Sequence, residues 1–240
     1  MPILSLQNLV KVYGGRKVVN SVNMAIQSSR VVGLLGPNGA GKTTTFYMAV
    51  GMIRPDVGKV MLDEEDVTDS PMYIRARKGI GYLPQETSIF RKLTVRQNIL
   101  AILEYMPLSV DEQVERANSL MDELGIRNLE NKSASLLSGG ERRRLEISRA
   151  LCTRPSFILL DEPFAGIDPL AIIDIKNIIV HLKKRGIGIL ISDHNVRETL
   201  GVCDEAYILS DGRVIETGSP EKIADSEICR RIYLGDEFSL

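Results

Sequence analysis

Residues 31–43 read VVGLLGPNGAGKT, a short apolar run followed by a glycine-rich loop that ends in Lys42 and Thr43. The loop fits the pattern G-x-x-x-x-G-K-[ST], and the stretch behind it, TTTFYMAVGMI, can form a helix. A strand, this loop and a helix in that order are the context that a phosphate-binding loop requires. The stretch therefore predicts an α/β domain that binds a nucleotide.

Each part of this loop has a chemical task. Its glycines let backbone N–H groups and the N-terminus of the following helix face a phosphate. Lys42 places a positive charge at the terminal phosphates, and Thr43 offers its hydroxyl to Mg²⁺. A glycine-rich turn without a ligand is the alternative, but this pattern arises by chance in only roughly 1 in 100 chains of this length. The predicted phosphate-binding residues are Gly36, Pro37, Asn38, Gly39, Ala40, Gly41, Lys42, Thr43 and Thr44.

Other apolar runs extend the α/β prediction. Residues 157–160 (FILL), 187–191 (IGILI) and, more weakly, 206–209 (AYIL) are nearly continuous in hydrophobic residues. Such runs suit strands that are buried on both faces of a parallel sheet. The first 30 residues alternate more and contain a Gly14–Gly15 turn, so we expect an antiparallel, half-exposed sheet packed on this core.

The region from 92 to 155 has helical periodicity instead. Within DEQVERANSLMDELGI, apolar residues recur at helical spacing from Val114 to Leu124, and Gly125 is placed to end that helix. Strand signals are nearly absent here. We therefore expect a single domain in which residues 1–91 and 156–240 form the core and residues 92–155 form a helical insert.

Two carboxylates end the apolar run in FILLDEP, residues 157–163. Asp161, at the end of a strand beside the phosphate loop, can hold Mg²⁺ through water. Glu162, the next residue, can accept a proton from an attacking water. A solvated acidic turn is the alternative, and the neighbouring phosphate loop makes it the weaker one.

Three more residues are candidates for the same site. His194 ends the predicted strand GILISDH, and we predict that it positions the γ-phosphate or the water. Gln85 follows the short strand IGYL and can ligate Mg²⁺ or orient a water, although a lone glutamine is more often solvated. Tyr13 can stack on adenine, with an exposed strand aromatic as the alternative. The other histidine, His181, lies in a plausible helix and is expected to be packed or at the surface.

Composition limits the other functions. The chain has 240 residues, of which 44% are hydrophobic and 25% charged, as is ordinary for a globular protein. A net charge of -1 gives no bulk attraction to nucleic acid or anionic lipid. Three cysteines outside any metal-binding spacing indicate reduced thiols in a cytosolic protein. No signal peptide or membrane-spanning run is visible, so we expect any work at a membrane to go through a partner.

Taken in order, these residues resemble the nucleotide-binding subunit of an ABC transporter over essentially the whole chain. Tyr13 matches the adenine-stacking aromatic, residues 36–43 the Walker A motif and Gln85 the Q-loop. LSGGE, residues 137–141, matches the signature motif, which other phosphate-loop ATPases lack. ILLDE matches Walker B, residues 166–168 the D-loop, and His194 the switch histidine. The resemblance implies an ABC-type P-loop NTPase with a RecA-like α/β core, an N-terminal antiparallel β-subdomain and an inserted helical subdomain.

The resemblance also implies a homodimer that holds ATP and Mg²⁺ between its subunits. Each nucleotide is expected between the Walker A motif of one subunit and Ser138, Gly139 and Gly140 of the other. These residues would open the helix ERRRLEISRAL, where backbone N–H groups can approach the γ-phosphate. A plain serine N-cap is the alternative. The following Arg142–Arg144 are expected to be a partly solvated helix start rather than a nucleic-acid contact.

Roles for the remaining residues come with the resemblance. Thr43, Gln85 and Asp161 would hold Mg²⁺, Glu162 would act as general base, and His194 would hold the γ-phosphate side. Two other classes stay open. A repair-type ABC ATPase needs a long coiled coil between Gln85 and Ser138, and the gap leaves no room for one. Translation factors of the family usually carry two cassettes in one chain, and this chain has one. A binding protein that does not hydrolyse ATP is disfavoured by the presence of both Glu162 and His194.

Longer stretches narrow the resemblance to one branch. LPQETSIFRKLTVRQNI, DEPFAGIDPLAI and ISDHNVRETL are similar to the ATPase of the lipopolysaccharide exporter of Gram-negative bacteria. Branched-chain amino acid importers share several of these strings and are the alternative. The branch implies a peripheral protein on the cytoplasmic face of the inner membrane, bound to two transmembrane permease subunits. Ile89, Phe90 and Arg91 are predicted to contact these permeases, or else to be loop residues packed on the helical insert.

Overall fold

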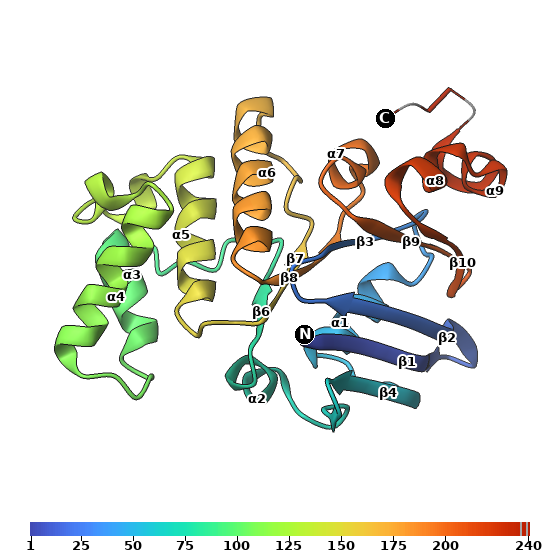
Figure 1. Ribbon diagram of the computed structural model, residues 1–240, viewed down its shortest axis with the longest axis horizontal. Helices are drawn as coiled ribbons and strands as arrows, with labels where there is room; N and C mark the ends of the chain where they lie inside the picture. The colour runs from blue at the N-terminus through green and yellow to red at the C-terminus, as the bar shows by residue number, and fades with distance from the viewer. Residues whose placement is uncertain (236, 239) are drawn as a thin grey trace.

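Two β-sheets form the centre of the computed structural model, which describes residues 1–235, 237–238 and 240 (Figure 1). The larger sheet has the strand order β10-β9-β3-β8-β7-β6, and its neighbours are parallel except for β10, which is antiparallel to β9. Every residue of β3, β7 and β8 is buried, which confirms the prediction of strands covered on both faces. The strands are β3 (Val31–Leu35), β6 (Ile80–Leu83), β7 (Phe157–Asp161), β8 (Gly188–Ser192), β9 (Glu205–Ser210) and β10 (Arg213–Gly218).

The smaller sheet is antiparallel and has the order β2-β1-β4-β5. Its first two strands form the expected hairpin, and Gly14 and Gly15 in the turn both have positive φ. The second hairpin has no clear sequence signal, because Gly58 and Lys59 interrupt the apolar pattern of its first strand. The strands are β1 (Ile3–Tyr13), β2 (Arg16–Gln27), β4 (Val57–Leu62) and β5 (Glu65–Asp66).

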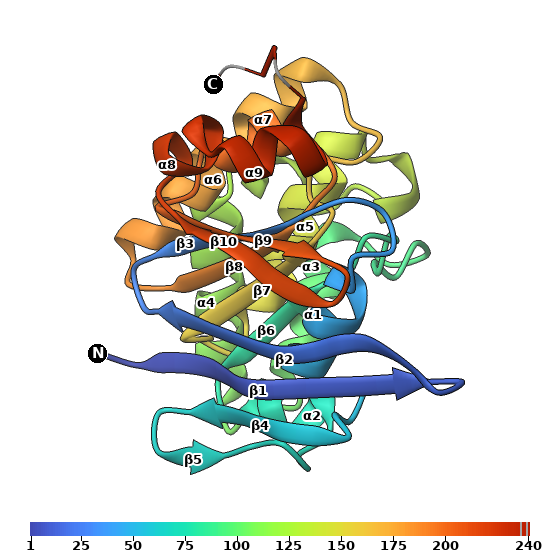
Figure 2. The ribbon, with the colours of Figure 1, turned by 90° about the vertical axis from the view of Figure 1, so that its right-hand side faces the viewer.

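Helix α1 (Lys42–Val50) packs between the two sheets, which Figure 2 shows one above the other. Its Phe46 and Met48 are fully buried in a hydrophobic cluster with residues of β1 and β3. Arg75, on α2 (Met72–Arg77), is also fully buried, and its guanidinium donates to the carbonyl oxygens of Met48 and Ala49 at 2.7 Å. A cation is favourable at the C-terminal end of a helix, so Arg75 fixes α1 in place.

The other helices of the core lie along the larger sheet. Helix α6 packs its Ile175, Ile179 and Leu182 into the same hydrophobic cluster as β7 and β8. In the part of the chain that the structure describes, no helix combines the length and the hydropathy needed to cross a bilayer. The helices of the core along the larger sheet are α6 (Pro169–Lys184), α7 (Val196–Leu200), α8 (Pro220–Asp225), α9 (Glu227–Cys229) and the π-helical turn η3 (Arg230–Leu234).

The chain between β6 and β7 forms the group of helices at the left of Figure 1. Because β6 and β7 are neighbours in the sheet, this region joins the core through one pair of adjacent strands. Helix α4 ends at Glu123, and Gly125 follows with a φ of +64°, as the sequence predicts. The three α-helices each begin with a capping box, in which a side-chain oxygen accepts from a backbone N–H of the first turn. The elements are α3 (Val95–Leu103), α4 (Val110–Glu123), the 3₁₀ turns η1 (Arg127–Leu129) and η2 (Ala134–Leu136), and α5 (Gly139–Leu151).

Candidate functional site

Four neighbouring parallel strands, β3, β8, β7 and β6, end at one edge of the larger sheet. Because their carboxyl ends meet there, the segments that follow them are brought together although they are far apart in the sequence. The phosphate loop follows β3, His194 comes shortly after β8, Asp161 and Glu162 lie at the end of β7, and Gln85 comes shortly after β6. The fold thus gathers the predicted acidic, imidazole and amide groups beside the loop.

Glu162 is at the centre of this group. Its Oε2 atom accepts a hydrogen bond from the Gln85 amide at 2.8 Å and lies 3.3 Å from Nδ1 of His194. Its backbone has a φ of +45°, in the left-handed region that costs a side-chain-bearing residue about 1–2 kcal/mol. Its N–H is held by the Ser192 carbonyl oxygen at 2.7 Å, which offsets that cost. Two side chains, those of Gln85 and His194, therefore converge on the carboxylate of Glu162, whose backbone is fixed.

Asp161, next to Glu162, lies almost out of solvent, with 6% of its surface exposed. Burial raises the pKa of this carboxyl above its ordinary value, and a hydrogen bond from Tyr82 partly opposes the shift. The Tyr82 hydroxyl is 3.4 Å from Oδ2 of Asp161. Tyr82 was not among the predicted residues. Its only sequence signal is a hydroxyl-bearing side chain in the apolar strand IGYL, one residue before the strand ends.

Asp193, the residue before His194, is another buried carboxylate at this edge of the sheet, and the sequence assigns it no role of its own. It is fully buried, and its oxygens accept from the backbone N–H groups of Phe164 at 2.9 Å and Asn195 at 2.8 Å. It thereby ties the turn after β7 to the turn after β8, which carries His194. Burial raises its pKa, while those two hydrogen bonds oppose the shift.

The phosphate loop is seated between β2 and β9. Gly41 has a φ of +98°, and a Cβ there would lie 2.5 Å from the Val18 carbonyl oxygen; a Cβ at Gly36 would lie 2.1 Å from the Leu209 carbonyl oxygen. Only glycine fits at these two positions. Lys42 donates to the carbonyl oxygens of Gly36 and Pro37 at 2.6 and 3.0 Å. Burial lowers the pKa of Lys42, and the negative charge of Glu162 opposes that shift, so the two charges act on one another across the site.

The loop's other predicted residues differ in exposure. Asn38, Gly39 and Thr43 are exposed, Pro37 and Thr44 are half-buried, and Ala40 is buried. Tyr13 is 48% exposed at the end of β1, with the Lys11 ammonium 5.5 Å from the centre of its ring. Since Gly41 packs against Val18 of β2, the β1–β2 hairpin that carries Tyr13 lies beside the loop.

The stretch Ser138–Gly140 lies elsewhere, at the start of α5. The Ser138 hydroxyl accepts from the Glu141 N–H at 3.3 Å, and the Glu141 carboxylate accepts from the Ser138 N–H at 2.8 Å. Helix α5 begins at Gly139, two residues earlier than the run ERRR suggests. Figure 1 shows α6 between α5 and the helix of the phosphate loop, α1. A hollow of about 360 Å³ is lined by Ser138, Gly140, Asp168 and their neighbours.

The run Arg142–Arg144 is partly solvated: Arg142 and Arg144 are half-buried, whereas Arg143 points inward, is 8% exposed and donates to the Pro84 carbonyl oxygen at 3.0 Å. One expectation needs correction. Ile89, predicted as a partner contact, is 7% exposed and packs in the hydrophobic core, so it is not available to a partner in this conformation. Phe90 is 45% exposed, and Arg91 is exposed as well.

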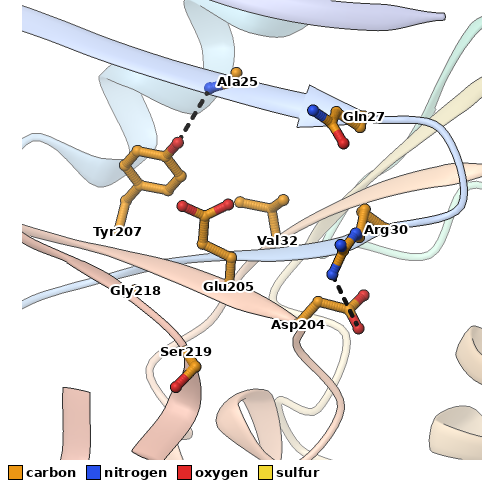
Figure 3. Close-up of a pocket in the computed structure, with 9 residues that line it drawn as sticks. All are labelled: Ala25, Gln27, Arg30, Val32, Asp204, Glu205, Tyr207, Gly218 and Ser219. Carbon is orange, nitrogen blue, oxygen red and sulfur yellow. Dashed lines mark hydrogen bonds and ion pairs between the residues drawn. The ribbon is translucent and has the colours of Figure 1, made fainter. Parts of the chain in front are cut away.

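A separate pocket of about 340 Å³, shown in Figure 3, lies between β2 and the larger sheet. It is lined by the first residues of β3 and β9, at the opposite end of these strands from the phosphate loop. None of the predicted nucleotide-site residues lines it. Glu205 and Tyr207 line this pocket, and the Tyr207 hydroxyl accepts a hydrogen bond from the Ala25 N–H of β2. Both residues therefore belong to the junction between the two sheets.

Comparison with known proteins relates this geometry to a family. The family model described as "ABC transporter" matches residues 19–165. The chain is 54% identical, over all of both chains, to proteins called lipopolysaccharide export system ATP-binding protein LptB in Haemophilus influenzae and in Escherichia coli K12. Among solved structures, the ADP conformation of MJ1267, an ATP-binding cassette of an ABC transporter, superimposes with a TM-score of 0.88 at 30% identity. That match covers 98% of this chain and 100% of the other.

Proposed function

The chain belongs to the ABC transporter family of ATP-binding proteins, and we propose that it is the ATP-hydrolysing subunit that powers lipopolysaccharide export. The observation that carries the hydrolytic part is the contact of Gln85 and His194 with the Glu162 carboxylate, at the same sheet edge as the phosphate loop. The lipopolysaccharide part rests on the two relatives that match along their whole length. A branched-chain amino acid importer is the alternative that the sequence leaves.

The residues around Asp161 fit a magnesium ion. Mg²⁺ prefers hard oxygen ligands, and Asp161, Thr43 and Gln85 offer a carboxylate, a hydroxyl and an amide carbonyl. The raised pKa of Asp161 fits as well, since a buried carboxylate is stabilised by a cation beside it. We propose that these three residues hold Mg²⁺, which would neutralise charge on the phosphates of ATP. The Walker A residues 36–44 would hold those phosphates, and Tyr13 the adenine ring.

The hydrolytic step falls to Glu162 and His194. A carboxylate that accepts from Gln85 can also accept a proton from a water that attacks the γ-phosphate. His194, whose Nδ1 faces that carboxylate, leaves the other edge of its ring for the phosphate side. Because Lys42 and Glu162 already influence each other electrostatically, a γ-phosphate held by Lys42 would lie close to the general base. We therefore assign Glu162 as the base and His194 as the group that positions the phosphate.

Separation of the signature from the phosphate loop supports a head-to-tail homodimer. Ser138 and Gly140 line a hollow that contains no residue of the loop, so they would serve the nucleotide of a second copy. Ser138 and Gly139 are exposed at the N-terminus of α5, and the N-terminus of a helix suits an anion. The exposed Phe90 and Arg91 would contact transmembrane permease subunits, which would place the protein on the cytoplasmic face of the inner membrane.

Purification from detergent-solubilised membranes tests this function. We expect two exporter-type permease subunits to accompany the chain, and the complex to hydrolyse ATP. Glu162→Gln should lower kcat by about 100-fold or more, because the general base is lost while ATP binding is kept. Glu64→Gln, in an exposed turn, should hydrolyse like wild type. Importer permeases would overturn the export assignment, and full turnover by Glu162→Gln would overturn the catalytic one.

A further inference from the structure

The segment Pro84–Phe90 carries Gln85 but is fastened mainly to the helical region. In the described chain, every side chain that hydrogen-bonds the backbone of this segment comes from α3 or α5. From α3, the fully buried Asn98 holds both the N–H and the carbonyl of Phe90, at 2.8 and 3.0 Å. The remaining contacts come from a single face of α5, the helix that the signature motif opens.

Three side chains of α5 make that second set of contacts. Arg143 donates to the Pro84 carbonyl at 3.0 Å, and Glu146 accepts from the Ser88 N–H at 3.0 Å. Arg149 donates to the Ser88 carbonyl, and its guanidinium lies 4.5 Å from the centre of the Phe90 ring. Positions 143, 146 and 149 are three residues apart, so they share a face of the helix. We call these three residues the α5 clamp.

Two of the three clamp residues, Arg143 and Glu146, form a buried ion pair. Arg143 and Glu146 are 8% and 5% exposed, and their Nη1 and Oε2 atoms are 3.1 Å apart. Buried charges are costly, so a pair of this kind is weak evidence for stability alone. Here each member also holds a backbone group of the segment on one side of Gln85, Arg143 that of Pro84 and Glu146 that of Ser88. That geometry gives the pair a task other than stabilising α5.

We propose that Arg143, Glu146 and Arg149 are positioning residues that hold Gln85 against Glu162 and make the Q-loop segment move with the signature helix. The proposal rests on the proposed function, in which Glu162 is the general base. A shift of α5 would carry Pro84 and Ser88 with it and change the 2.8 Å contact between Gln85 and Glu162. The same shift would be felt at Phe90, through Arg149. One helix would thereby link the signature, the Q-loop and the exposed aromatic.

The test separates positioning from packing. In Arg143→Met with Glu146→Leu, apolar side chains replace the ion pair, so the fold should be kept while both tethers are lost. We expect a melting temperature close to wild type, and a fall in kcat of at least about tenfold because the reacting groups are misplaced. KM for ATP should change by less than about twofold, since Walker A is untouched. The Mg²⁺ concentration for half-maximal rate should rise, because Gln85 is a proposed ligand.

Two variants provide the comparison. Glu146→Gln keeps an acceptor for Ser88 and leaves Arg143 on Pro84, so kcat should stay near wild type while the melting temperature falls. Arg96→Met with Glu130→Gln removes an ion pair of the helical region that does not touch the segment, and should leave kcat and Mg²⁺ dependence unchanged. Should the Arg143 and Glu146 double variant fail to fold, Arg149→Met, at a half-exposed site, should lower kcat in the same direction.

Amide hydrogen exchange gives a readout that needs no turnover. The Ser88 amide should exchange faster in the Arg143 and Glu146 double variant and at the wild-type rate in the Arg96 and Glu130 control. Unchanged exchange, or a kcat no lower than that of the control, would overturn the clamp. A wild-type chain that hydrolyses ATP no faster than Glu162→Gln would instead overturn the proposed function, and the exchange result would still decide the clamp.

Discussion

At the scale of single residues, the site contains some side chains that the sequence predicts and others that it does not. Lys42, Glu162 and His194 could be predicted because each follows an apolar run, where a parallel sheet places its functional side chains. Tyr82 and Arg143 could not be predicted. Their contacts reach 79 and 59 positions along the chain, and neither residue type carries a spacing signal for such contacts.

Asp161 provides a prediction about pH. Its folded-state pKa is raised by burial, so its ionised form costs folding stability above the unfolded-state pKa of about 3.9. Asp161→Asn should therefore raise the melting temperature of the nucleotide-free protein at pH 7 while abolishing Mg²⁺-dependent hydrolysis. Since a raised pKa means that the folded state binds the proton more tightly, this gain should be full above the folded-state pKa, shrink as the pH falls through it, and vanish below the unfolded-state pKa.

Thermal melts of both proteins between pH 8 and pH 4, without magnesium, measure this difference. Asp63→Asn, in an exposed turn, serves as the control for removing a carboxylate. A melting temperature of Asp161→Asn that lies below wild type at pH 7 would show that this carboxylate is stabilising when ionised, contrary to the effect of its burial.

At the scale of elements, two helices share one device. Ser138 and Ser109 both cap their helices through a capping box with a glutamate at the third position. Ser138→Ala and Ser109→Ala should each cost about 1 kcal/mol of stability, because each leaves a backbone N–H without its acceptor. Only Ser138→Ala should also lower the ATPase rate, because of these two helices only α5 would face a nucleotide.

Paired measurements of the free energy of unfolding and of kcat distinguish the two effects. Equal losses of turnover in the two variants would mean that Ser138 is only a helix cap. The start of α5 could be predicted to within two residues, because serine and glutamate at this spacing are an N-terminal signature. The β4–β5 hairpin could not, since β4 is set by its pairing with β1 rather than by its own pattern, and β5 has only two residues and pairs with β4 alone.

At the scale of the whole molecule, a head-to-tail dimer makes a prediction about mixtures. Lys42→Ala disables the phosphate loop, and Gly140→Asp should block the opposing signature by placing a charge near the γ-phosphate; a Cβ at Gly140 itself is accommodated. In a dimer with one copy of each, both substitutions fall in the same nucleotide site, and the other site is intact. Mixing the two inactive proteins should therefore restore ATPase activity.

Lys42→Ala mixed with Glu162→Gln is the matched control. Both residues act on the nucleotide of their own subunit, so each site of that mixed dimer keeps a defect and activity should stay absent. ATPase rates measured across mixing ratios give the answer. Recovery in both mixtures, or in neither, would contradict a composite site made from two copies.

The adjacency of β6 and β7 and the α5 clamp together bear on how such a chain can be recombined with its relatives. A graft of residues 92–155 would bring in a foreign α5 and leave the native Pro84 and Ser88 without their partners. A graft of residues 84–155 would carry the clamp with the segment that it holds, and its two junctions would fall beside paired strands. The unit that can be exchanged between relatives is therefore larger than the helices alone. Chimaeras joined at residues 83 and 156 should keep the contacts between α5 and the Q-loop segment, which an exchange of residues 92–155 would break.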